Sequence, residues 1–142
     1  MIGQTSGIEK AARCAAPVAT AYTIAAFGAD DDTLAIAQAG TGALVGVFQH
    51  TTSTAGETVR VMLTGISRVV LGGAVTRGDS VTSGASGMGV AATRHAHTEN
   101  TAAAYTQNAA TQAAPAVNTL GVALASGAAG DIIPVLLSQG MV

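Results

Sequence analysis

The sequence predicts a small all-β protein, either a β-barrel or a β-sandwich, with an extended N-terminal arm and one long Ala- and Thr-rich loop. Short runs of apolar and β-branched residues are separated by Gly- and Asp-rich turns, which recur about every 8 to 15 residues and favour a barrel or sandwich over a helical fold. A length of 142 residues suits one domain with its own core. The predicted organisation is an arm over residues 1–17 and a single β-rich domain over residues 18–142.

The arm is expected because residues 1–17 are rich in small side chains and lack the apolar–polar alternation of a strand. Ser6 and Glu9 have the spacing of a capping box, which predicts a short helix through Cys14 that Pro17 would end. We expect this arm to become ordered mainly by docking onto a neighbouring molecule.

The strands of the β-rich domain follow its apolar runs. Val59, Val61 and Leu63 alternate with polar neighbours, so one face of that strand should be buried. Comparable runs predict strands over residues 22–27, 34–37, 43–48, 58–64, 67–71 and 132–137, with β-structure resuming at Leu120 after a long interruption. The intervening turns carry the Gly and Asp residues that turns require.

Residues 93–119 form that interruption. They are rich in Ala, Thr, Gln and Asn and contain almost no large apolar side chain. We predict either a long surface loop or an insertion that is helical over about residues 101–114, and loops of this length are usually functional or disordered.

One internal similarity links two parts of the chain. Residues 46–64 and 121–138 each contain Gly-Val, then an acidic Ala-Gly-Glu or Ala-Gly-Asp turn, then an alternating apolar strand. This pattern predicts a strand, a tight turn and a second strand, used twice. Two such hairpins could pair their edges and close a small barrel, which would remove free strand edges.

The composition indicates a surface that is covered by partners. Charged residues make up 10% of the chain and hydrophobic residues 49%, whereas ordinary soluble domains contain about 25% charged residues. With a formal net charge of −2, such a surface has little protection against self-association. Lys and Arg form no cluster, so the sequence argues against nucleic acid as a partner.

The most apolar stretch, residues 11–29, is interrupted by Arg13, Pro17 and two Thr residues. It is therefore too polar for a spanning helix of about 20 residues, and we expect no membrane contact. The stretch resembles a signal peptide in composition, but we expect it to be retained and the protein to be made in the cytoplasm.

Three patterns contain some of the residues of a ligand site but lack others that such a site requires. His95, His97 and Glu99 share one face of an extended segment but are too few for a zinc site, so a polar loop is predicted. Residues 30–32 are three consecutive Asp residues without the spacing of a calcium loop, which favours a solvated turn. The Gly-Thr-Gly of residues 40–42 lacks the Lys of a phosphate-binding loop.

Two further patterns have simple structural interpretations. The Arg77-Gly78-Asp79 tripeptide, which integrins recognise, lies where a β-turn is expected. A single cysteine, Cys14, excludes an intramolecular disulfide and a thiolate zinc cluster, and we expect a buried or half-buried thiol. We therefore predict no catalytic, cofactor-binding or metal-binding residue, no cofactor and no enzymatic activity.

Two segments carry a resemblance to a known family. Residues 69–82 read Val-Val-Leu-Gly-Gly-Ala-Val-Thr-Arg-Gly-Asp-Ser-Val-Thr, and residues 121–137 combine Gly-Val-Ala-Leu, Ala-Gly-Asp and a Val-Leu-Leu strand. This pattern resembles the capsid decoration (cement, head-stabilising) proteins of tailed bacteriophages, over about residues 18–140. The resemblance implies a homotrimeric β-rich protein on the outer capsid surface of the virion. It would bind the major capsid protein and cement neighbouring subunits.

An alternative keeps the same β framework but gives it another role. In a virion-surface adhesion or receptor-binding module, residues 93–119 and the Arg77-Gly78-Asp79 turn would form the receptor loops. Such a module should present exposed aromatic anchors, because aromatic side chains dominate binding hot spots. The chain contains two Tyr, two Phe and no Trp.

Overall fold

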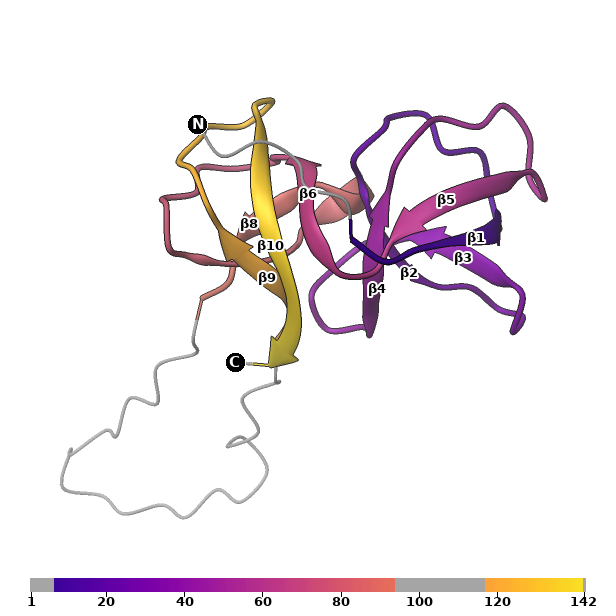
Figure 1. Ribbon diagram of the computed structural model, residues 1–142, viewed down its shortest axis with the longest axis horizontal. Helices are drawn as coiled ribbons and strands as arrows, with labels where there is room; N and C mark the ends of the chain where they lie inside the picture. Colours follow the sequence, from indigo (N-terminus) through magenta and orange to yellow (C-terminus); the bar gives the residue numbers. More distant parts are fainter. Residues whose placement is uncertain (1–6, 94–116, 142) are drawn as a thin grey trace, which may run out of the picture.

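The computed structural model describes residues 7–93 and 117–141, which form two five-stranded units side by side (Figure 1). The first unit is a closed barrel with strand order β1-β3-β2-β4-β5, and the second is a sheet with order β6-β10-β9-β7-β8. The all-β prediction is confirmed.

The strands of the first unit are β1 (Glu9–Cys14), β2 (Ile24–Phe27), β3 (Thr33–Ile36), β4 (Leu44–Phe48) and β5 (Thr58–Met62). Those of the second are β6 (Gly65–Val70), β7 (Ser80–Ser83), β8 (Gly89–Ala91), β9 (Asn118–Ala123) and β10 (Ile132–Met141), with a 3-10 turn η1 (Ala85–Gly87) between β7 and β8. The predicted strands are confirmed, and β1, β7 and β8 are additional. Residues 94–116 of the predicted loop lie outside the described residues.

The two units have the same strand order. Because β1 also pairs with β5, the strands of the closed barrel can be read in the other direction as β1-β5-β4-β2-β3. Replacing β1 to β5 in that order by β6 to β10 gives β6-β10-β9-β7-β8, the order of the second unit. In the first unit a parallel β1–β3 pair, with Cys14 opposite Leu34, closes the barrel. In the second unit the same closure is a single parallel bridge between Leu71 and Gly89. The chain is therefore a structural duplication of one five-stranded motif.

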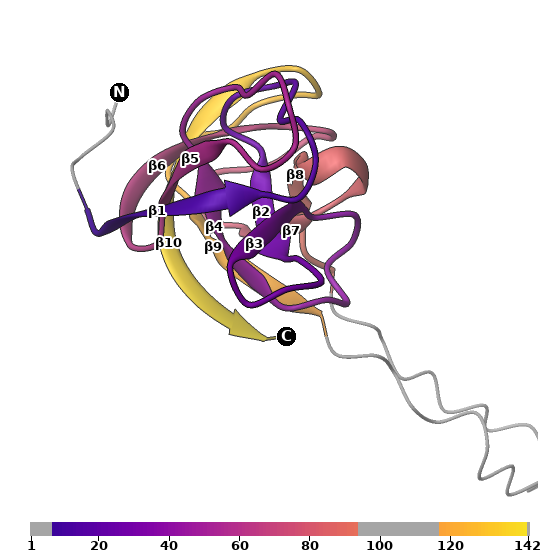
Figure 2. The ribbon, with the colours of Figure 1, turned by 90° about the vertical axis from the view of Figure 1, so that its right-hand side faces the viewer.

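The N-terminal prediction is wrong for the described residues. Glu9–Cys14 forms β1, which pairs antiparallel with β5 from Glu9 opposite Met62 to Arg13 opposite Thr58. Figure 2 looks onto the first unit and shows β1 as one of the strands of its barrel. This segment is therefore a strand of the barrel wall, with Cys14 buried in the core, and is neither a helix nor an arm. Large side chains from other parts of the first unit, among them Leu34 and Phe48, fill the barrel interior, and β1 contributes only the small side chain of Cys14 to this cluster. Residues 1–6 lie outside the described residues.

The repeated hairpins exist, but they do not pair with each other as predicted. β4–β5 and β9–β10 are antiparallel pairs in different units, and β1 closes the first barrel instead. One buried cluster fills the first barrel, and a larger one joins both units. The larger cluster contains the interior of the second unit together with a set from the first: Ile24, Ala37, Leu44, Val47 and Met62.

Candidate interaction surface

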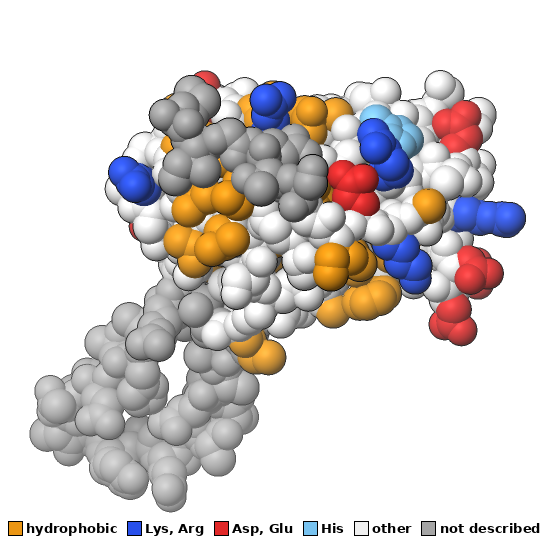
Figure 3. Space-filling model, viewed as in Figure 1, with side chains coloured by type: hydrophobic (Ala, Val, Ile, Leu, Met, Phe, Trp, Pro, Cys, Tyr) orange, Lys and Arg blue, Asp and Glu red, His pale blue; other side chains and the backbone are white. Residues whose placement is uncertain are grey.

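The two units differ in the charge that they present to solvent. Among the described residues, the first unit has a net formal charge of −2: three positive residues (Lys10, Arg13, Arg60) against five negative ones (Glu9, Asp30, Asp31, Asp32, Glu57). The second contains two of each sign: Arg68, Arg77, Asp79 and Asp131. Figure 3 shows most of the acidic side chains in that view over the first unit, on its right-hand side.

Exposed apolar side chains form a row across the outer face of the second unit. Val122 on β9 lies opposite Leu136 on β10, and Leu136 lies opposite Ile66 on β6. Val122 is 36% exposed and Leu136 43% exposed. Ile132 on the same strand is also exposed but lies outside this row, opposite Val70. Adjacent side chains on one sheet face form a continuous patch, and exposed apolar patches mark interaction sites. Hydrophobic side chains are visible over this unit in Figure 3.

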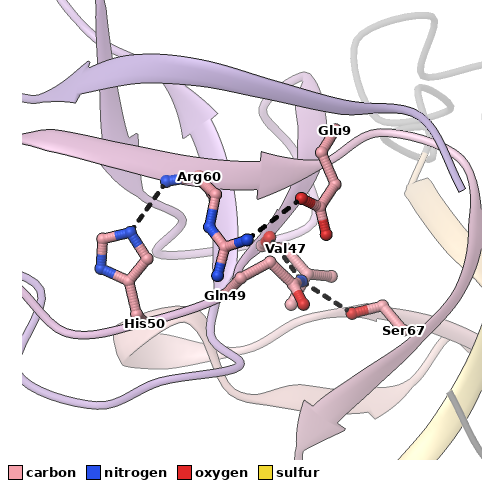
Figure 4. A network of polar contacts seen from close by, with 6 residues as sticks. All are labelled: Glu9, Val47, Gln49, His50, Arg60 and Ser67. Carbon is pink, nitrogen blue, oxygen red and sulfur yellow. Dashed lines mark hydrogen bonds and ion pairs between the residues drawn. The ribbon is translucent and has the colours of Figure 1, made fainter. Parts of the chain in front are cut away.

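A polar network lies where the two units meet (Figure 4). The Gln49 side-chain amide donates to the Val47 carbonyl and to Ser67 Oγ, both at 3.0 Å, and Ser67 belongs to β6 of the second unit. His50 Nε2 accepts the backbone N–H of Arg60 at 3.1 Å. The Gln49–Ser67 bond joins the two units, whereas the His50–Arg60 bond lies within the first unit, so the network has a structural role.

Three Gly-acid pairs form tight turns, and each acid serves the backbone. Gly56, Gly78 and Gly130 have φ values of +84°, +94° and +89°, a region that favours glycine. The carboxylates of Asp79 and Asp131 each accept a backbone N–H three residues earlier, at 2.9 Å. The turn predicted for Arg77-Gly78-Asp79 is confirmed, and its aspartate is engaged within the turn.

The carboxylate of Glu57 makes an equivalent contact one residue further back. It accepts the backbone N–H of Ser53 at 2.8 Å. This bond, together with a hydrogen bond from Thr54, holds the pKa of Glu57 below its ordinary value. The donors favour the charged form of the carboxyl group.

Residues 30–32 and 40–42, which the sequence offered as ligand sites, lie in turns of the fold. Asp30 to Asp32 form the β2–β3 turn, as predicted, with the N–H of Thr33 donating to the Asp30 carbonyl. The carbonyl of Gly42 accepts a hydrogen bond from Asn118 Nδ2 at 2.8 Å, and β4, rather than a helix, follows residues 40–42. A phosphate-binding loop would instead present N–H groups at a helix N-terminus.

Cys14 is a buried free thiol, as expected, with Sγ 3.3 Å from Thr52 Oγ1. His95, His97 and Glu99 lie outside the described residues. Within residues 7–93 and 117–141, no three His, Cys, Asp or Glu side chains are grouped to hold a metal ion. No helix in this part of the chain is long and apolar enough to cross a membrane.

The fold has a counterpart among solved structures. The chain matches the crystal structure of the head fiber gp8.5 N base of bacteriophage phi29, with a TM-score of 0.61 and 19% sequence identity. The match covers 92% of this chain and 93% of that one. The two chains share a fold. No protein-family model matches the sequence, and a search of curated proteins finds no match.

The exposure of Val122 and Leu136 was not predicted from the sequence. Alternation identified β10 as a strand with one buried face, but it could not show that the other face is apolar and uncovered. The repeat in the sequence aligns Val122 and Leu136 with Val47 and Met62, but only the structure shows that the first pair is exposed and the second buried.

Proposed function

We propose that this chain is a structural protein of a phage head, bound to the outer surface of the capsid. The observation that carries the proposal is the match in fold, over nearly the whole of both chains, to the base of a phage head fiber. The resemblance of residues 69–82 and 121–137 to capsid decoration proteins supports the same role independently.

The finer proposal is that the protein cements the capsid as a homotrimer. A trimer that touches three major capsid subunits binds far more tightly than one monomer, because its second and third contacts are intramolecular. Each contact can then be modest and made of apolar surface and backbone groups. The scarcity of charge agrees with this mechanism, because a surface covered by partners has little need of solvated side chains.

This role requires neither catalysis nor a cofactor, and we propose that the protein is not an enzyme. The adhesion alternative draws less support from the described residues. Phe27 is an exposed aromatic side chain, but Phe48 is fully buried, and the Asp79 carboxylate is engaged by the backbone of Thr76.

The test is to mix purified protein with capsids of the phage that encodes it. We expect saturable binding and a higher temperature of capsid disruption, measured by light scattering. Binding should change little when salt is raised, since few charges are available to be screened. Equal disruption temperatures with and without bound protein would contradict the cementing role. Failure to bind the capsid at all would contradict the head-surface role.

A further inference from the structure

The two units correspond residue by residue, far beyond the repeated hairpins. Gln49 N–H donates to the Arg60 carbonyl in the first unit, and Leu124 N–H donates to the Pro134 carbonyl in the second. The glycines of β4 and β9 correspond as well. A Cβ atom at Gly46 would lie 2.1 Å from the Met62 carbonyl oxygen, and one at Gly121 would lie 1.9 Å from that of Leu136. Met62 therefore corresponds to Leu136.

The equivalent surfaces of the two units differ in whether another part of the chain covers them. Val47 lies opposite Met62 in the first unit, and both side chains are fully buried. They belong to the large cluster that contains the interior of the second unit, against which β4 packs through β6, β9 and β10. Val122 lies opposite Leu136 in the same way, yet these two remain 36% and 43% exposed. The described chain holds no third unit that covers them.

The surface that receives the first unit has a counterpart too, which is half-buried. Val69, Leu120 and Leu137 of the second unit are buried in the joint cluster. Their counterparts in the first unit are Ala12, Val45 and Leu63, which are half-buried and border the barrel core. The second unit thus has an uncovered apolar face at Val122 and Leu136. The first unit has a half-buried barrel edge at Ala12, Val45 and Leu63, beside the junction, where the side-chain amide of Gln139 from β10 donates to the Val45 carbonyl.

We propose that the Val122–Leu136 face of one copy packs on the Ala12–Val45–Leu63 face of a second copy. The contact repeats between chains the packing of the first unit on the second within a chain. It joins different surfaces of the two partners, so it is head-to-tail, and successive contacts close into a ring when the rotation permits. The inference specifies the interface of the homo-oligomer in the proposed function and rests on that part of it.

The first test compares two substitutions on one strand, in solution and without capsids. Leu136→Asp places a charge in the proposed contact. Ile132→Asp is the matched control, because Ile132 is 52% exposed but corresponds to Thr58, which is exposed outside the joint cluster. By native mass spectrometry we expect wild type and Ile132→Asp to form the same oligomer and Leu136→Asp to be monomeric. Circular dichroism should show that both variants are folded.

The second test identifies the partner surfaces. Val47 and Val69 lie on strands in contact, so the equivalent pair between chains is Val122 with Ala12. We expect Ala12→Cys with Val122→Cys to form disulfides between chains on mild oxidation, and Ala12→Cys with Ile132→Cys to form few. Leu136→Cys alone should not link to itself, because a head-to-tail contact keeps the two copies of Leu136 apart.

The results separate this inference from the proposed function. A wild-type protein that stays monomeric at every concentration would overturn the interface, as would an oligomer that survives Leu136→Asp or dissociates equally with Ile132→Asp. Efficient self-linking of Leu136→Cys would replace the head-to-tail contact by a symmetric one. Capsid binding is measured separately, so an oligomer that ignores capsids would contradict the proposed function and leave the interface intact.

Discussion

The two five-stranded units share a strand order but differ in how they are closed and in what surrounds them. In the first, Glu9 beside Met62 forms an ion pair with Arg60, 3.6 Å apart. In the second, the corresponding positions are Ile66 and Pro134, and the neighbouring Leu136 is exposed. One backbone framework thus presents a charged, solvated outer surface in one unit and an apolar one in the other. Burial in this protein depends on what packs on the framework rather than on the framework itself.

The largest difference in stability is expected between substitutions at one equivalent position in the two units. Met62→Ala removes a fully buried side chain between the units and should lower the free energy of unfolding by about 2 to 5 kcal/mol. Leu136→Ala at the corresponding exposed position should change it by less than about 0.5 kcal/mol in dilute, dissociated protein. Urea unfolding followed by circular dichroism measures both. Equal losses would show that the two faces are equally covered in the monomer.

A smaller effect is expected at the turns that precede β2 and β7. Tyr22 and Gly78 occupy equivalent positions, with φ values of +64° and +94°, and each N–H donates to a neighbouring strand. Gly78→Ala should destabilise the fold by about 1 to 2 kcal/mol, because a side chain strains the left-handed backbone. An added Cβ meets nothing within 4 Å there, so steric overlap contributes little.

The matched control for this substitution is Gly42→Ala. An added Cβ also meets nothing within 4 Å at Gly42, but its φ lies outside the left-handed region. Thermal unfolding should therefore place Gly42→Ala near the wild type and Gly78→Ala clearly below it. A loss at Gly42 as large as that at Gly78 would show that backbone strain is not the cause.

Much of the fold could be predicted from the sequence where side chains alternate. Val59 and Val61 are buried and Arg60 is exposed, as the period of two requires. β1 was missed because the residues that it turns toward the barrel are small: Cys14 lies in the core, and Ala12 is half-buried at its edge. No alternation of large and polar side chains could mark such a strand.

The full duplication could not be predicted because backbone hydrogen bonds preserve it with little help from side chains. Cys14 and Leu71 are equivalent, since the N–H of each donates to the carbonyl of the acid in a Gly-acid turn, yet their side chains differ. The residues at the equivalent positions Tyr22 and Gly78 differ in the same way. The interaction surface was missed for a related reason: exposure of Leu136 depends on the absence of a covering unit, which local sequence does not encode.

The smallest expected effect concerns the acids of the repeated turns. In the first unit the bond from Ser53 N–H lowers the pKa of Glu57 from 4.5. A lowered folded-state pKa stabilises the fold above the pKa of the unfolded chain, and this contribution is lost as the pH falls through the folded-state value. Glu57→Gln should therefore melt slightly below the wild type at neutral pH, and the difference should shrink as the pH falls below 4.5. Asp31→Asn, an exposed turn residue, removes the same charge and serves as the control. A melting difference for Glu57→Gln that stays constant from neutral to acidic pH would show that the Ser53 bond does not depend on the charge of Glu57.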